Sequence, residues 1–206
     1  MQNLKISAFD WAALQLFTAK NDVRNYLQGI HIGEKYLSAT NGHVLMRIEH
    51  GQDLAGLIPS VGLIVEPVKV ATKRAPTGDN AEIILIFEQY VPTGCTAPSY
   101  SVSLSANNAP GLEQKLSIVN ATYPDCERVI PARCSRYTTN NYYDANYVEL
   151  IGKAAKLLGK AIDIKAPMTQ ILGKENSASL VEVYHRADVT MVIMPMRGPK
   201  NEKGEG

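Results

Sequence analysis

Four histidines are the residues of this chain best suited to acid–base or metal chemistry: His31, His43, His50 and His185. None has the spacing of a metal-ligand pair such as HExxH, and no local motif joins a histidine to a serine or cysteine nucleophile. The sequence also contains no phosphate-binding loop. We expect His43 to be a turn or partly buried polar residue. The sequence therefore predicts a protein that is not an enzyme and needs no metal ion or cofactor.

The three cysteines offer little chemistry of their own. Cys95, Cys126 and Cys134 are an odd number without CxxC spacing, which disfavours both a disulfide framework and a zinc site. Cys126 has Arg128 as its only basic neighbour in "YPDCERVIP", so we expect it to pack rather than to act as a nucleophile. The cysteines are predicted to be reduced thiols.

Composition and charge limit the remaining classes. Hydrophobic residues make up 45% of the 206 residues and charged residues 20%, which is enough to form a core in one or two domains. A net charge of +1 disfavours a protein that binds nucleic acid by neutralising many phosphates. "MQNLKISAFDW" lacks the layout of a signal peptide, and no run of about 18 apolar residues occurs. We expect a soluble, cytoplasmic protein.

The elements that must position any site recur in three rounds, each with a helix-like stretch followed by short strands. In the first round Ser7 is a predicted helix N-cap. The expected apolar face comprises Phe9, Ala12, Ala13, Leu16 and Phe17, and the opposite face Trp11, Gln15 and Thr18. Strands and turns follow in "RNYLQGIHIG", "YLSATNG" and "HVLMRIEHG", with a tight turn at Asn41-Gly42.

The second round predicts a short helix over "VEPVKVATKRAP", with Pro67 near its start, where a missing amide costs least. Strands are predicted in "AEIILIFEQ", "YSVSLSAN" and "KLSIVNATY", which are rich in β-branched residues.

The third round predicts a helix capped by Asp144, with Tyr147, Ile151, Ala154 and Leu158 on its apolar face. Lys153, Lys156 and Lys160 fall on the opposite face. Strands are predicted in "AIDIKA", "LVEVYH" and "TMVIMPM". Residues 198–206 have the composition of a disordered tail.

Three separated phrases, read in order, resemble one known family. They are "DVRNYLQGI…LSATNGHVL" at 22–45, "YPDCERVIP" at 123–131 and "VIMPMR" at 192–197. The family is the bacterial DNA sliding clamp, the beta subunit of DNA polymerase III. Its middle domain carries patterns like (R)YxLNG…ATDGHRL and FPDYRRVIP, and its last domain ends in a phrase like VVMPMRL.

The resemblance implies an α+β protein with the DNA clamp fold, made of repeated helix-plus-antiparallel-strand units that amount to about one and a half clamp domains. Residues 1–131 resemble the complete middle domain, and residues 132–197 resemble the end of the last domain. The tail 198–206 has no family counterpart. A shortened clamp relative of this kind suits a phage or another mobile element.

The resemblance also implies a peptide-binding pocket built from the three phrases. Its walls of Leu, Val, Ile and Met suit leucine and phenylalanine anchors, with Arg128 and Arg197 at the polar rim. The implied pocket residues are Leu27, Thr40, Gly42, His43, Leu45, Pro124, Arg128, Val129, Val192, Ile193, Met194, Pro195, Met196 and Arg197.

Clamps enclose duplex DNA in a ring, and the resemblance implies DNA-facing residues and a homo-oligomer here too. The implied set is Arg24, Asn25, Tyr26, Lys69, Lys73, Arg74, Lys153, Lys156 and Lys160. The alternative for the lysines of the third helix is a merely solvated face.

Two functions follow from the resemblance. The first is a processivity factor that tethers a DNA polymerase, or other replication and repair proteins with clamp-binding motifs, to duplex DNA. The alternative is a peptide-binding adaptor or decoy that does not encircle DNA. The sequence departs from the family pattern at Asn41, Val44, Cys126 and Gly198, which bears on partner specificity.

Overall fold

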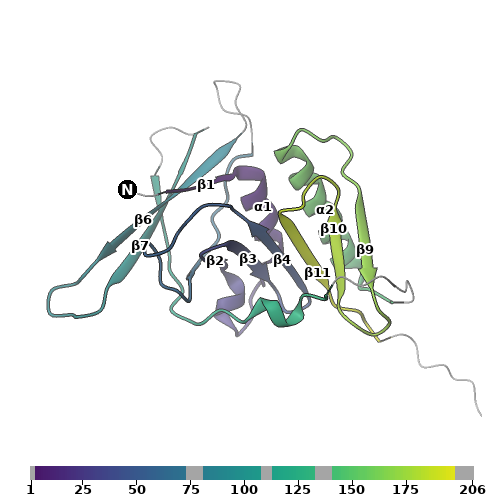
Figure 1. Ribbon diagram of the computed structural model, residues 1–206, viewed down its shortest axis with the longest axis horizontal. Helices are drawn as coiled ribbons and strands as arrows, with labels where there is room; N and C mark the ends of the chain where they lie inside the picture. The colour runs from purple at the N-terminus through teal and green to yellow at the C-terminus, as the bar shows by residue number, and fades with distance from the viewer. Residues whose placement is uncertain (1–2, 73–80, 108–112, 133–140, 198–206) are drawn as a thin grey trace, which may run out of the picture.

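Two antiparallel sheets and two α-helices form the described part of this computed structural model (Figure 1). The structure describes residues 3–72, 81–107, 113–132 and 141–197. The smaller sheet has the order β1-β6-β7-β8 and the larger one β5-β2-β3-β4-β11-β10-β9. The strands are β1 (Asn3–Ser7), β2 (Ile30–Ile32), β3 (Tyr36–Thr40), β4 (Val44–Glu49), β5 (Leu63–Val65), β6 (Glu82–Tyr90), β7 (Ser99–Ala106), β8 (Glu113–Leu116), β9 (Thr169–Gly173), β10 (Ser179–Val183) and β11 (Val189–Ile193).

The first helix, α1 (Ala8–Phe17), begins where the sequence predicts. The Ser7 side chain accepts a hydrogen bond from the Phe9 amide at 3.2 Å, which satisfies one of the free amides at the helix start. The predicted helix is therefore confirmed. Its predicted polar face is wrong at Trp11, which is fully buried, and at Thr18, which is also buried.

The three rounds of the sequence form three structural repeats, and the first two exchange their first strands. β1 precedes α1 of the first repeat in the chain but pairs with β6, in the sheet that holds β6, β7 and β8 of the second repeat. In return, β5 precedes the second repeat but pairs with β2. Because each repeat contributes its leading strand to the sheet of the other, the two repeats share one hydrophobic core.

The helix predicted over "VEPVKVATKRAP" does not form in described residues 66–72. The Val68 carbonyl instead accepts hydrogen bonds from the indole Nε1 of Trp11, at 3.1 Å, and from the Gln15 side chain. Val68 and Val70 also pack against the core. This segment covers the outer face of α1, which is why Trp11 is buried there. Lys73 and Arg74 lie outside the described residues.

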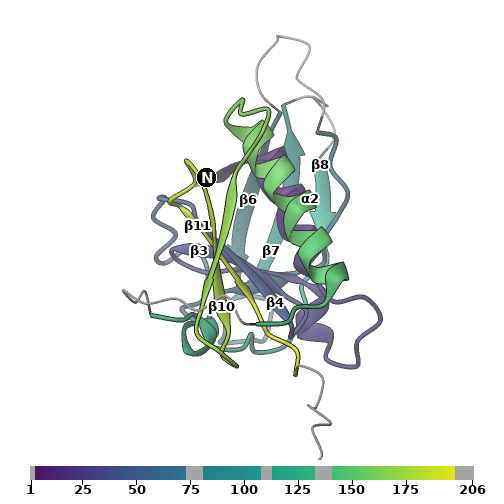
Figure 2. The same cartoon turned by 90° about the vertical axis from the view of Figure 1, so that its right-hand side faces the viewer.

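The second helix, α2 (Ala145–Ala161), is capped by Asp144, whose carboxylate accepts from the Asn146 amide at 2.8 Å. Ile151, Ala154 and Leu158 are buried, as predicted. Figure 2 shows α2 beside α1, with which it is in contact. Within the described part of the chain, no helix is long and apolar enough to cross a membrane.

The strand predicted at "AIDIKA" is wrong. The amides of Ile162 and Ile164 donate to the Gly159 carbonyl at 3.1 and 2.8 Å, and Asp163 has a φ of 57°. These residues form the end of α2, where a left-handed residue closes the helix. The strand that follows is β9, while "LVEVYH" and "TMVIMPM" largely coincide with β10 and β11.

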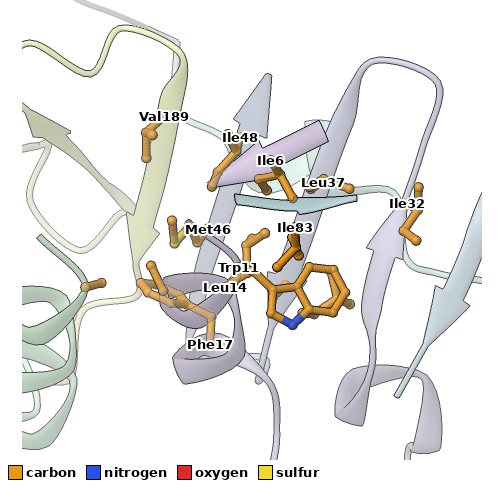
Figure 3. Packing of buried hydrophobic residues seen from close by; sticks show 14 of the residues in the cluster. Ile6, Trp11, Leu14, Phe17, Ile32, Leu37, Met46, Ile48, Ile83 and Val189 are labelled. Atoms are coloured by element: carbon orange, nitrogen blue, oxygen red, sulfur yellow. The ribbon is translucent and has the colours of Figure 1, made fainter. Parts of the chain in front are cut away.

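The third repeat joins the first through antiparallel pairing of β11 with β4. Val44, Met46 and Ile48 on β4, with Met191 and Ile193 on β11, face the helices and belong to the core. Figure 3 shows Met46 from this strand near Leu14 of α1, and Ile48 near Ile6 of β1. Because side chains alternate along a strand, the intervening Leu45 and Val192 face the opposite side.

A buried ion pair fixes the same junction. Arg186, between β10 and β11, donates to the Asp10 carboxylate of α1 at 2.8 Å and to the Leu158 carbonyl of α2 at 3.2 Å. The carboxylate of Asp188 also pairs with the Arg186 guanidinium, at 2.7 Å. Burial raises the pKa of Asp10, while the guanidinium of Arg186 opposes that shift. One arginine thus links both helices to the third repeat.

Candidate functional site

A cavity of about 180 Å³ opens on the face of the larger sheet that points away from the helices. Leu45 and Val192 lie at its floor, where they are paired across the junction of β4 with β11. Both are almost fully buried, yet neither belongs to the main core. The floor therefore exists only because the first and third repeats share one sheet.

The loop between β3 and β4 and the strand ends on either side of it form one wall, with Gly42 and His43 from the loop, Thr40 from β3 and Val44 from β4. The Asn41 side chain accepts hydrogen bonds from the amides of His43 and Val44 at 2.9 and 3.0 Å, which closes the turn. Gly42 has a φ of 91°, a conformation that favours glycine. The tight turn predicted from "NG" is confirmed.

The segment around the short 3-10 helix η2 (Cys126–Val129) forms the opposite wall, with Pro124, Asp125, Cys126 and Val129. Asp125 caps η2 by accepting from the Glu127 amide at 3.1 Å. Glu127 also pairs with Arg47 of β4, so an ion pair attaches this wall to the sheet.

Tyr123 anchors the start of this wall. Its ring stacks on His31 with centroids 4.6 Å apart and planes 8° from parallel. Tyr123 is buried, and burial raises the pKa of its hydroxyl. This packing holds the wall against β2.

Cys126 lies half-buried in the same wall. Burial raises the pKa of its thiol to about 11, so the reactive thiolate is scarce near neutral pH. This supports the interpretation of Cys126 as a packing residue. Cys134 lies outside the described residues.

The third side comes from the short 3-10 helix η1 (Asn25–Gln28) and the residue before it. Leu27 is buried, and Arg24 and Tyr26 line the opening. Arg24 makes a two-point ion pair with Asp22 at 3.0 and 2.8 Å, which lowers the pKa of Asp22 to about 2. Arg24 and Tyr26, expected near DNA, thus lie at this cavity, and Asn25 is exposed beside them.

Met194 completes the site just after β11. Its amide donates to the His43 carbonyl at 2.9 Å, which ties the end of β11 to the β3–β4 loop. The imidazole of His43 is exposed and stacks on Tyr147 of α2 at 5.3 Å. His43 is therefore a turn residue, as predicted, but it is exposed rather than partly buried.

The remaining expected pocket residues lie elsewhere. Ile193 points into the core beneath the helices, since it follows Val192 on the strand. Arg128 is exposed and pairs with Asp125 at 3.1 Å. Pro195, Met196 and Arg197 do not line the cavity, and the Met196 amide donates to the Tyr142 carbonyl at 2.7 Å. The tail 198–206 lies outside the described residues.

Besides Arg24 and Tyr26, which were expected near DNA, three further lining residues were not expected in the pocket: Val44, Asp125 and Cys126. All three stand inside the phrases that carry the resemblance, and two of them depart from the family pattern. The signal that could have identified them is their position between residues already assigned to the walls.

The expected DNA-facing lysines of α2 are exposed. Lys153 pairs with Glu149 at 2.8 Å, whereas Lys156 and Lys160 make no ion pair with any described residue. Lys69 is exposed in the segment that covers α1. Among the residues that the structure describes, no group of histidine, cysteine, aspartate or glutamate side chains could hold a metal ion.

The cavity thus combines an apolar floor with a partly charged rim. Leu27, Leu45, Val129, Val192 and Met194 can enclose apolar side chains. Arg24, His43 and Asp125 stand around the opening. This arrangement suits binding of an apolar anchor rather than catalysis.

Solved structures that share the fold include bacterial sliding clamps. The chain aligns with DNA polymerase III subunit beta from Borrelia burgdorferi, in complex with a natural product, at a TM-score of 0.60 and 13% identity, over 97% of this chain and 65% of that one. The alignment with the corresponding subunit from Pseudomonas aeruginosa has a TM-score of 0.58 and 17% identity, and it covers 96% of this chain and 67% of that one. For pol III beta from Caulobacter crescentus the TM-score is 0.55 and the identity 15%, with 96% of this chain and 66% of that one covered. No protein-family model and no curated protein matches the sequence.

These likenesses show the fold. The chain has the sliding-clamp fold, amounts to about one and a half clamp domains and spans about 65% of the Borrelia clamp's length. The expected fold class and the resemblance to clamps are therefore confirmed. One of the similar clamps, from Pseudomonas aeruginosa, was solved bound to griselimycin.

Proposed function

We propose that this chain, which has the fold of bacterial sliding clamps, is a processivity factor that tethers replication proteins to duplex DNA through the cavity at the β4–β11 junction. In this proposal residues 1–131 act as the complete clamp-like unit and residues 132–197 as the half unit. The observation that carries the proposal is the cavity itself. Its floor and walls come from the three phrases that resemble clamps, although overall identity is only 13–18%.

The chemistry of the cavity supports a peptide partner. Moving the leucine and phenylalanine side chains of a peptide from water onto the floor of Leu45 and Val192 would be favourable, because it buries apolar surface. Met194 has a flexible thioether side chain, which can adapt to more than one anchor. The guanidinium of Arg24 and the imidazole of His43 line the opening and can donate hydrogen bonds to peptide carbonyls.

The DNA half of the proposal rests on α2. Lys153, Lys156 and Lys160 stand exposed along one side of this helix. A clamp that encloses DNA needs only weak backbone contacts, so a net charge of +1 is compatible with this role.

A specific observation favours the alternative, a peptide-binding adaptor that does not encircle DNA. α1 has no lysine or arginine, and residues 66–70 cover part of its outer face. Of the two α-helices in the described part of the chain, only α2 therefore carries basic residues. An adaptor would keep the cavity and lose DNA-dependent activity.

Titration of a fluorescent peptide with a Gln-Leu-x-Leu-Phe type motif tests the shared part of both proposals. Saturable binding, displaced by unlabelled peptide, is the expected result. If the peptide does not bind, the cavity is not a clamp-type pocket and both proposals fail.

A further inference from the structure

Residues 124–129, which form the wall of the cavity around η2, bury none of their side chains. Cys126 is half-buried and the others are exposed, although Tyr123 just before them is buried. Hydrogen bonds within this wall, such as the one from the Glu127 amide to the Asp125 carboxylate, do not connect it to the sheet. Side-chain burial therefore does little to fix the wall in place.

One ion pair links this wall to the larger sheet. Among the described residues, the contact of Glu127 with Arg47 is the only hydrogen bond or ion pair that joins residues 124–129 to a strand. Arg47 follows Leu45 by two positions on β4, so it lies on the same face of the sheet, next to the cavity floor. The Arg47 side chain is 14% exposed and that of Glu127 is 67% exposed. The pair is therefore partly open to water and to screening by salt.

The position of the wall also leaves Arg47 incompletely bonded. Its guanidinium lies over the Tyr36 ring, 4.0 Å from the centroid, and its buried Nε has no hydrogen-bond partner in the described part of the chain. A buried donor without a partner raises the free energy of this arrangement. Moving the wall away would let water reach Nε, so the closed position is held against an opposing tendency to open.

The size of the cavity gives a reason for such movement. Its volume is about 180 Å³, whereas pockets that enclose ligands usually measure about 300–1,000 Å³. Pairing of β4 with β11 fixes the floor, and the closed β3–β4 turn fixes one wall. The buried side chain of Leu27 fixes the η1 side. Residues 124–129 are therefore the part that can move to admit two apolar anchors.

We propose that residues 124–129 are a lid over the cavity and that Arg47 is the positioning residue that holds the lid closed through Glu127. The lid lifts to admit the anchors of a partner peptide and then closes over them, an inference that rests on the proposed peptide-binding function. Because the same ion pair forms in the free and the peptide-bound protein, it controls how fast a peptide enters and leaves more than how tightly the peptide binds.

Alkylation of Cys126 by a small reagent, located by peptide mass spectrometry, measures lid opening without any peptide ligand. Opening uncovers this half-buried thiol, while the exposed Cys95 provides an internal reference. Glu127→Gln and Arg47→Met each remove the ion pair and should each speed alkylation of Cys126 about threefold to tenfold. Glu34→Gln, at an exposed glutamate between β2 and β3, is the control for net charge and should leave the rate unchanged.

The two variants separate lid opening from a direct electrostatic effect on the thiol. Arg47 lowers the pKa of Cys126, and Glu127 raises it. If the lid did not open, Arg47→Met would slow alkylation and Glu127→Gln would speed it, because the thiolate is the reactive form. Faster alkylation in both variants is therefore the result expected of a lid. Opposite changes in the two variants, or no change in either, would overturn the proposal.

Stopped-flow binding of an uncharged, end-blocked peptide with the Gln-Leu-x-Leu-Phe motif tests whether the lid controls entry. Association and dissociation should both become about threefold to tenfold faster in Glu127→Gln, while Kd changes by less than about twofold. A change in Kd with an unchanged association rate would contradict a lid. If the wild type binds no peptide, the proposed function fails, and alkylation of Cys126 still decides whether residues 124–129 lift.

Discussion

Leu45 on β4 and Val192 on β11 lie opposite each other in the register of the larger sheet and together form the floor of the cavity. They belong to two repeats about 150 residues apart in the chain, so neither repeat alone could build the floor. The stability of the junction and the binding properties of the cavity should therefore depend on each other.

The Arg186 network should control the stability of that junction. Arg186→Met removes the partner of the buried Asp10 carboxylate and should lower the free energy of unfolding by about 3–5 kcal/mol. Urea denaturation followed by circular dichroism measures the change. Arg128→Met, at an ion pair that is exposed to solvent, is the control and should have little effect. Equal losses in the two variants would contradict the role of Arg186.

The packing of Trp11 should hold the segment that replaces the predicted second helix. Trp11→Phe removes the indole hydrogen bond to the Val68 carbonyl and should cost about 1–3 kcal/mol of unfolding free energy. Hydrogen exchange should become faster at the amides of residues 66–70. Unchanged protection there would show that Trp11 does not fix the segment.

The stability of the protein should fall as the pH drops below about 6.5. Burial lowers the pKa of His31, whose Nε2 donates a hydrogen bond to the Val61 carbonyl at 3.0 Å, and burial also lowers the pKa of His50. The folded state therefore binds fewer protons than the unfolded state, and unfolding is favoured as pH decreases through this range.

His31→Phe keeps an aromatic ring against Tyr123 but cannot titrate. Its unfolding free energy should change less between pH 7 and pH 5 than that of the wild type, with His50 supplying the remaining dependence. Chemical denaturation at several pH values gives the slope of unfolding free energy against pH for the wild type and for His31→Phe. Identical slopes in the two proteins would exclude His31 as a contributor to the pH dependence of stability.

The lysines of α2 should matter only if the protein contacts DNA. Lys156→Glu with Lys160→Glu should weaken DNA binding and lower the salt dependence by about one unit of log–log slope per lost phosphate contact. Lys35→Glu, at an exposed lysine between β2 and β3, provides the control for net charge. Fluorescence anisotropy with duplex DNA at several salt concentrations gives both quantities. If all variants bind duplex DNA as the wild type does, the result would support the adaptor proposal over the processivity factor.

The features that the sequence predicts correctly are local ones. Ser7 and Asp144 cap their helices because capping involves residues only two or three positions away. The Asn41-Gly42 turn is local for the same reason. "AIDIKA" misleads because the alternating Ile162 and Ile164 of a helix end look like a strand.

Other features depend on contacts that are distant in the sequence. The segment 66–72 is held by Trp11 rather than by its own helix propensity. Arg186 and Asp10 are separated by 176 positions, and no local pattern links them. The resemblance places Ile193 in the pocket with Val192, although strand alternation sends the two side chains to opposite faces.

The most direct test of the central claim compares two methionines that lie two positions apart. Met194 lines the cavity, whereas Met196 does not and is 52% exposed. A fluorescent clamp-binding peptide should bind Met194→Ala about tenfold more weakly than the wild type, and Met196→Ala as tightly as the wild type. Equal affinities for all three proteins, or equal losses in both variants, would contradict the assignment of this cavity as the partner-binding pocket.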